Sequence, residues 1–283
     1  MFSRNSEADE NIRSGERTFE YKEGKYNLPN DKALVYYSAI LLTSFKLIAD
    51  SELGTGIWAI DFGKTWPSRL FCYFNQFSAK QYPSSQVLGI DLSAMQPLSP
   101  PPNCRFKIHD AESDWDFPEK FDYIHGRAVI SCFEDPSSIL RKAFDSLATN
   151  GYLEMQDIIF PAQWIGDAPI DSYLYRSIEM IVAGAAKLGR PWTNVKHYKR
   201  WMEEIGFEGV TERVFYCPLG VWAEGDHYKD LGMHWQILAL AGLEAASSRF
   251  LGAAGLSGEE IKTFIEGVKR DMKDPSMHAF VAM

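Results

Sequence analysis

Three short segments carry the residue types that an adenosine-containing cofactor requires. The glycines of the turn ELGTG (52–56) would let the main chain approach a ligand closely. Asp91 ends the apolar run VLGID, and Asp110 ends the run CRFKIHD. A carboxylate at the end of such a run can accept hydrogen bonds from both ribose hydroxyls, and the acid of the next run can reach the adenine amino group. The candidate cofactor-binding residues are Glu52, Gly54, Gly56, Asp91, Leu92, Asp110 and Ala111.

Each of these features also has a purely structural interpretation. Two glycines are common in any turn that enters a helix. An aspartate after a strand often caps the following turn with its carboxylate. The residue types alone therefore leave both interpretations open for the turn 52–56, for Asp91 and for Asp110.

Two further residues could transfer a proton during catalysis. His125 and Glu154 lie near the ends of the runs FDYIHGR and GYLEMQD. A hydroxyl or amine nucleophile often needs a base that removes its proton. His125 is the preferred candidate because the ordinary pKa of histidine lies near neutrality. The alternative for His125 is local packing or hydrogen bonding.

Other chemistries lack their motifs in this sequence. The acidic run 110–116 has Trp115 at the sixth position, where a calcium-binding EF-hand loop needs glycine. No phosphate-binding GxxxxGK[ST] and no nucleophile elbow GxSxG occur. The four cysteines form no CxxC pair, so we expect neither a zinc site nor any other metal.

Alternating strands and helices must position these residues. Apolar runs predict strands over 86–93, 104–111, 121–127 and 151–160, with a helix over 136–147. Strands that alternate with helices favour a mostly parallel sheet with helices on both faces. Right-handed crossovers then bring the carboxyl ends of the strands to one edge, where ligands bind.

The rest of the chain is predicted to surround this sheet. Residues 1–25 are polar and are expected to form a disordered arm before a single domain over 26–283. Helical lid segments are expected over about 161–206 and 219–272, and short strands over 211–218 and 278–283. The individual helices are expected at 32–45, 171–187, 195–205, 227–251 and 257–272.

Charge and apolar patterning limit the expected partners and location. The net charge is −9 and no run of Lys and Arg occurs, so direct binding of nucleic acid is not expected. No stretch supplies the roughly 20 apolar residues of a membrane span, and the N-terminus lacks the apolar core of a secretory signal. We expect a cytoplasmic protein, with the nucleus as an alternative.

A series of motifs resembles the LaeA-like methyltransferases of fungi, which are associated with secondary-metabolite gene clusters and their regulation. The resemblance runs from about Tyr26 to His278. It implies an α/β fold with a Rossmann-like class I methyltransferase sheet of seven strands, mostly parallel, under a helical cover. It also implies S-adenosylmethionine as cofactor, held by Gly54, Gly56, Asp91 and Asp110. The motifs are YNLPND, LGTGIWAIDF, VLGIDLSAMQP, PPNCRFKIHDAESDW, FDYIHGR, GYLEMQD, KLGRP, EEIGF and PLGVW.

On this resemblance we expect an enzyme that methylates a small secondary metabolite at oxygen, nitrogen or carbon. The alternatives are a regulatory protein that acts through protein partners, or an auxiliary protein with weak or no catalysis. The chain departs from the family in two places. The first is a shortened glycine loop. The second is the aromatic segment 68–83, which accounts for the separation of 35 residues between Gly56 and Asp91, where about 20 are usual. This segment is either an insertion that packs over the cofactor or a retained intron, and its deletion is expected to improve folding or cofactor affinity.

Overall fold

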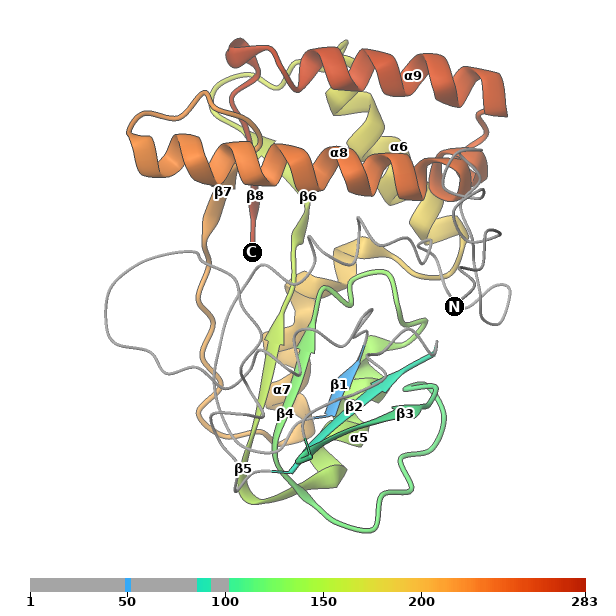
Figure 1. The fold of residues 1–283 in the computed structure, drawn as a ribbon, viewed down its shortest axis with the longest axis vertical. Coiled ribbons are helices and arrows are strands. Elements are labelled where there is room, and N and C mark those ends of the chain that lie inside the picture. Colours follow the sequence, from blue (N-terminus) through green and yellow to red (C-terminus); the bar gives the residue numbers. More distant parts are fainter. Residues whose placement is uncertain (1–48, 52–85, 93–101) are drawn as a thin grey trace, which may run out of the picture.

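The computed structural model of the chain describes residues 49–51, 86–92 and 102–283 (Figure 1). The predicted arm 1–25, the glycine turn 52–56 and the segment 68–83 lie outside these residues. The described part consists of a parallel sheet with its helices and an antiparallel sheet under three long helices (Figure 1).

Five strands form the parallel sheet in the order β3-β2-β1-β4-β5, and every neighbouring pair runs parallel. All five residues of β2 and six of the seven residues of β4 are buried, as expected for central strands of a sheet that is covered on both faces. The strands are β1 (Ala49–Ser51), β2 (Val87–Asp91), β3 (Cys104–Ile108), β4 (Phe121–Arg127) and β5 (Leu147–Gln156). Their carboxyl ends define one edge, called the carboxyl edge below.

Helix α5 (Pro136–Ser146) covers one face of this sheet. It begins where the Asp135 side chain accepts a hydrogen bond from the Ser138 main-chain N–H at 3.1 Å. Its buried residues Ile139 and Ala143 pack with Leu88, Ile90 and Ile124 in one hydrophobic cluster. This packing fixes β2 and β4, the strands that lead to Asp91 and His125.

The second sheet is antiparallel and has the order β6-β8-β7. It consists of β6 (Ile159–Trp164), β7 (Tyr216–Pro218) and β8 (Ala279–Ala282). Only Asp157 and Ile158 separate β5 from β6, so the chain passes almost directly from one sheet into the other. Among the described strands β6 pairs only with β8, on one side, and such an edge position tolerates Pro161.

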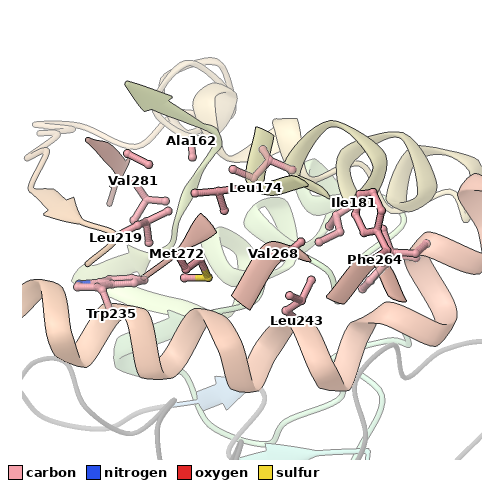
Figure 2. Close-up of a cluster of buried hydrophobic side chains, with 14 of the residues drawn as sticks. Ala162, Leu174, Ile181, Leu219, Trp235, Leu243, Phe264, Val268, Met272 and Val281 are labelled. Carbon is pink, nitrogen blue, oxygen red and sulfur yellow. The ribbon is translucent and has the colours of Figure 1, made fainter. Parts of the chain in front are cut away.

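Two helices pack on the antiparallel sheet, α6 (Tyr173–Lys187) and α8 (Asp226–Ala254), and a third, α9 (Gly258–Asp271), packs on both of them. The three are called the helical cover. Figure 2 shows their shared core, in which Leu174 and Ile181 of α6 face Leu243 of α8 and Phe264 of α9. Helices α6 and α8 approach closely at Gly184, where an added Cβ would lie 2.0 Å from the Phe250 carbonyl oxygen. Only glycine permits this contact.

Between α6 and β7 the chain returns to the parallel sheet. The 3-10 helix η1 (Trp192–His197) leads into α7 (Tyr198–Ile205), which packs beside α5. Arg141 of α5 donates to the Ile205 carbonyl oxygen at 3.0 Å. A second 3-10 helix, η2 (Pro275–Met277), precedes β8.

The structure agrees with the predicted α/β class and mostly parallel sheet, and it differs in detail. The strand predicted over 151–160 ends at Gln156, because Asp157 turns inward and accepts a hydrogen bond from the Ile158 N–H at 3.1 Å. Residues 159–164 form a strand where the helical lid was predicted to begin. In place of one seven-stranded sheet, the described residues form a five-stranded and a three-stranded sheet.

Candidate cofactor site at the carboxyl edge

Asp91 and Asp110 lie next to each other at the carboxyl edge. Asp91 is the last residue of β2, and its register partner on β3 is Ile108, two residues before Asp110. The Asp91 side chain is buried, with 3% of the residue exposed, and its carbonyl oxygen accepts the His109 N–H at 2.9 Å. Leu92 follows in a half-buried bend. The neighbouring strands therefore bring together the two acids that the sequence assigned to ribose and adenine.

Residues 110–113 form a tight turn, called the Asp110 turn below. The Asp110 Oδ1 atom accepts the Glu112 N–H at 2.9 Å, and the Asp110 carbonyl oxygen accepts the Ser113 N–H at 2.9 Å. Ala111 is buried in the core, and its carbonyl oxygen accepts the Trp115 indole N–H at 2.9 Å. One oxygen of Asp110 thus serves the turn, which is the structural role considered from the sequence.

The acceptor oxygens at this edge fit an adenosine-containing cofactor. Ribose hydroxyls and an adenine amino group are hydrogen-bond donors. Asp91 supplies acceptor oxygens at the end of β2, and Asp110 supplies them in the turn after the adjacent strand β3. The predicted residues Glu52, Gly54 and Gly56 lie outside the described residues. Among the described residues, no group of three or more His, Cys, Asp or Glu side chains is arranged to hold a metal ion.

His125 and Glu154 face each other across β4 and β5. They are register partners, each two residues before the end of its strand, and His125 is only 1% exposed. The Tyr123 ring stacks beside the imidazole with centroids 6.3 Å apart, and its hydroxyl donates to Glu154 Oε2. Gln156 donates to Glu154 Oε1 at 2.6 Å. The structure therefore places both residues within the sheet face, below the carboxyl edge.

Asp157 is a buried acid at the carboxyl edge that the sequence reasoning missed. It is 6% exposed and directly follows β5. Main-chain N–H groups of Val129, Ile130 and Ile158 donate to its carboxylate, and the Tyr198 hydroxyl donates to Oδ2 at 3.4 Å. Burial nevertheless dominates and raises the pKa of Asp157 to about 7, and burial likewise raises the pKa of Tyr198.

The loop after β4 is shaped so that its N–H groups reach Asp157. Ala128 has a left-handed backbone with φ of 54°, a conformation that a non-glycine residue adopts at a cost. Its own N–H donates to the Gln156 carbonyl oxygen at 3.0 Å, which holds the loop against β5. The next two residues, Val129 and Ile130, then present their N–H groups to the Asp157 carboxylate.

Arg127 and Arg190 are two further buried residues that the sequence reasoning missed. Arg127 ends β4 on the same face as His125 and is 8% exposed. Arg190 is 1% exposed and lies between Glu112 and Glu134. Both arginines belong to motifs of the family resemblance, FDYIHGR and KLGRP. An arginine inside such a motif is the sequence feature that could have pointed to them.

A surface hollow of about 230 Å³ lies away from these residues, near the start of β4. Its lining includes Phe117, Lys120 and Asp145, from the amino-terminal side of the sheet. It does not reach the carboxyl edge, and we assign it no role. None of the described helices has the length and apolar character that crossing a lipid bilayer demands.

Comparisons with known proteins find relatives that are similar to this chain over most of its length. The methyltransferase pytC of Aspergillus terreus is 28% identical over 286 residues, which cover 94% of this chain and 83% of pytC. The secondary metabolism regulator LAE1 of Cochliobolus heterostrophus is 28% identical over 240 residues, which cover 82% of this chain and 73% of LAE1. A solved SAM-dependent methyltransferase from Thiobacillus denitrificans, in complex with S-adenosyl-L-homocysteine, aligns with a TM-score of 0.44 at 12% identity and covers 100% of this chain and 98% of that one.

The similarity to pytC and LAE1 confirms the predicted resemblance to the LaeA-like methyltransferases of fungi. A family model described as a methyltransferase domain matches residues 50–212. That match begins within β1, includes β2 to β5 and ends beyond α7. Because it spans more than half of the sequence, this chain belongs to the methyltransferase domain family.

Proposed function

We propose that this protein transfers a methyl group from S-adenosylmethionine to an oxygen, nitrogen or carbon atom of a small fungal secondary metabolite. Membership of the methyltransferase domain family supports the reaction class. Similarity to the methyltransferase pytC over 94% of the chain supports a place in fungal secondary metabolism. The observation that carries the proposal is the buried Asp91 at the end of β2, beside the Asp110 turn.

In this proposal the carboxyl edge holds the cofactor. Asp91 would accept the ribose hydroxyls and Asp110 the adenine amino group, while Gly54 and Gly56 would allow the main chain to approach. When bound, the cofactor would supply an electrophilic methyl group on its sulfonium. The protein contributes mainly by orienting the substrate nucleophile in line with that group.

His125 is the proposed base for a hydroxyl or amine substrate. The Glu154 carboxylate already accepts hydrogen bonds from Tyr123 and Gln156, so we assign it the positioning of Tyr123 beside His125. A substrate proton would have to come within hydrogen-bond reach of the imidazole, about 3 Å. The substrate would therefore have to enter the sheet face below the carboxyl edge.

Calorimetric titration with S-adenosylhomocysteine tests the proposed cofactor site. We expect the wild type to bind, and Asp91→Asn to lose about 1–3 kcal/mol of binding free energy because the ribose hydroxyls lose a charged acceptor. Asp114→Asn is the matched control, since this exposed acid lies beyond the Asp110 turn and should leave the affinity unchanged. Absence of binding heat with folded wild-type protein would refute the proposal.

A regulatory role without a metabolite substrate is the second candidate, because LAE1 is similar over 82% of the chain. It would act through protein partners, with weak or no catalysis, in the nucleus. The enzymatic proposal instead places the protein in the cytoplasm. Neither candidate includes direct contact with nucleic acid, since the net charge is −9.

Metabolite profiles of a deletion strain separate the two candidates. The strain is complemented with either the wild-type gene or the Asp91→Asn variant. If the protein is an enzyme of one pathway, its loss causes an intermediate that lacks one methyl group to accumulate. If the protein is a regulator, its loss removes whole sets of metabolites. If no under-methylated intermediate accumulates and several pathways are silent, the result favours the regulatory role.

A further inference from the structure

Arg190 is the most deeply buried charged side chain among the described residues, with 1% of the residue exposed. Its guanidinium donates to Glu112 Oε2 at 3.2 Å, to Glu134 Oε1 at 3.1 Å and to the Cys132 carbonyl oxygen. A buried arginine is tolerated only when its charge and its donors are paired, as they are here. The position of Arg190 is therefore closely constrained.

The end of helix α6 directs Arg190 toward these partners. Gly189 has a φ of +77°, and its N–H donates to the Ala186 carbonyl oxygen at 3.0 Å. The Arg190 N–H donates to the Ala185 carbonyl oxygen at 3.0 Å, which completes a Schellman motif, and Pro191 prevents the helix from continuing. The motif KLGRP thus ends a helix of the helical cover and points its arginine at the parallel sheet.

Glu112 connects Arg190 to the candidate cofactor site. It belongs to the Asp110 turn, and its N–H donates to Asp110 Oδ1 at 2.9 Å. Its other carboxylate oxygen, Oε1, accepts the Glu134 N–H at 2.7 Å. The Glu112 side chain is 18% exposed, whereas that of Glu134 is 67% exposed, so Glu112 is the partner that Arg190 holds in a largely buried position.

We propose that Arg190 is a positioning residue for the adenine end of the cofactor, because it holds Glu112 and thereby fixes the orientation of the Asp110 carboxylate. This inference rests on the proposed function. It also makes the helical cover part of the cofactor site, since Arg190 follows α6 while Asp110 follows β3. Lysine cannot replace the arginine fully, because its single ammonium lacks the planar fork that reaches three acceptors.

The test measures the affinity and the base selectivity of the folded protein by calorimetry. The ligands are S-adenosylhomocysteine and S-inosylhomocysteine, which carries an oxygen in place of the adenine amino group. The variants are Arg190→Lys, Glu112→Gln and their combination. Glu134→Gln is the matched control, since it removes an Arg190 partner that lies outside the Asp110 turn. Thermal unfolding of each variant shows that the titrations are made on folded protein.

We expect Arg190→Lys and Glu112→Gln each to raise the Kd for S-adenosylhomocysteine about tenfold, equivalent to about 1.4 kcal/mol. The Kd for S-inosylhomocysteine should change little, so the preference for adenine falls. The double variant should lose no more than either single variant because both act through the same contact. Glu134→Gln should keep the wild-type values.

Three results would overturn the inference. The first is an unchanged Kd in folded Arg190→Lys. The second is an equal loss for both ligands, which indicates general disturbance of the fold. The third applies if Arg190→Lys does not fold, so that Glu112→Gln is the deciding variant. It is an unchanged preference of folded Glu112→Gln for S-adenosylhomocysteine over S-inosylhomocysteine. A wild type that binds neither ligand removes the proposed function itself, and this inference with it.

Discussion

We expect the replacement Asp157→Asn to change how the stability of the protein depends on pH. Asp157 is buried between the loop after β4 and Tyr198 of α7, and burial raises its pKa from 3.8 to about 7. Between these two values the folded protein keeps the proton on Asp157, while the unfolded chain has lost it. The folded state therefore binds more protons, and the free energy of unfolding falls as the pH rises through this window.

The magnitude follows from the two pKa values. Their separation corresponds to about 4 kcal/mol of stability that is present below pH 3.8 and lost once the pH exceeds 7. Between pH 5 and pH 8 the loss amounts to about 2–3 kcal/mol. Asn cannot ionise, so the variant lacks this loss. Its amide faces N–H donors and costs some stability, but that cost is the same at every pH.

Urea unfolding followed by tryptophan fluorescence at pH 5, 6, 7 and 8 measures the effect. We expect the stability of Asp157→Asn relative to the wild type to increase from pH 5 to pH 7 and to level off above pH 7. Asp122→Asn is the control, because this side chain is exposed on β4 and should follow the wild-type curve. A constant difference between Asp157→Asn and the wild type would show that Asp157 is ionised in the folded protein throughout, and the argument from burial would be wrong.

Two further predictions concern the helical cover. Gly184→Ala should lower the free energy of unfolding by about 3 kcal/mol or more, because its Cβ would meet the Phe250 main chain. Gly252→Ala, which has no heavy atom within 4 Å of its added Cβ, should instead stabilise α8 by about 0.5–1 kcal/mol in the same urea titration. Ser257→Ala should cost about 1 kcal/mol, because it removes the capping box with Glu260 that begins α9. Equal stabilities for the two glycine variants, or an unchanged Tm for Ser257→Ala, would contradict these assignments.

The parallel sheet was predictable because its strands are short buried apolar runs. The run 121–127 has the same bounds in the sequence prediction and in β4. Asp91 and Asp110 could be brought together from the sequence because parallel strands share a carboxyl edge. The same run placed His125 near the end of its strand, and His125 lies two residues before the last residue of β4.

The missed features depend on contacts between distant parts of the chain. Strand β6 contains a proline and is stabilised by pairing with β8, so its own residues do not identify it. The predicted helix 171–187 ends at the same residue as α6, but its sequence does not show that Arg190 reaches Glu112. Asp157 directly follows β5 but lay inside the predicted strand 151–160, and its buried state requires Tyr198 from a later helix.

The central place of β8 in the antiparallel sheet has a consequence for the order of folding. Ile159 of β6 pairs with Ala282 of β8, about 120 residues later, and within the described part of the chain β7 likewise pairs only with β8. During synthesis the ribosome therefore releases every described strand of the parallel sheet well before β6 and β7 can acquire their shared partner. Until β8 arrives, the apolar faces of α6 and α8 lack part of the core that they later share, and in this interval the nascent chain is most exposed to aggregation.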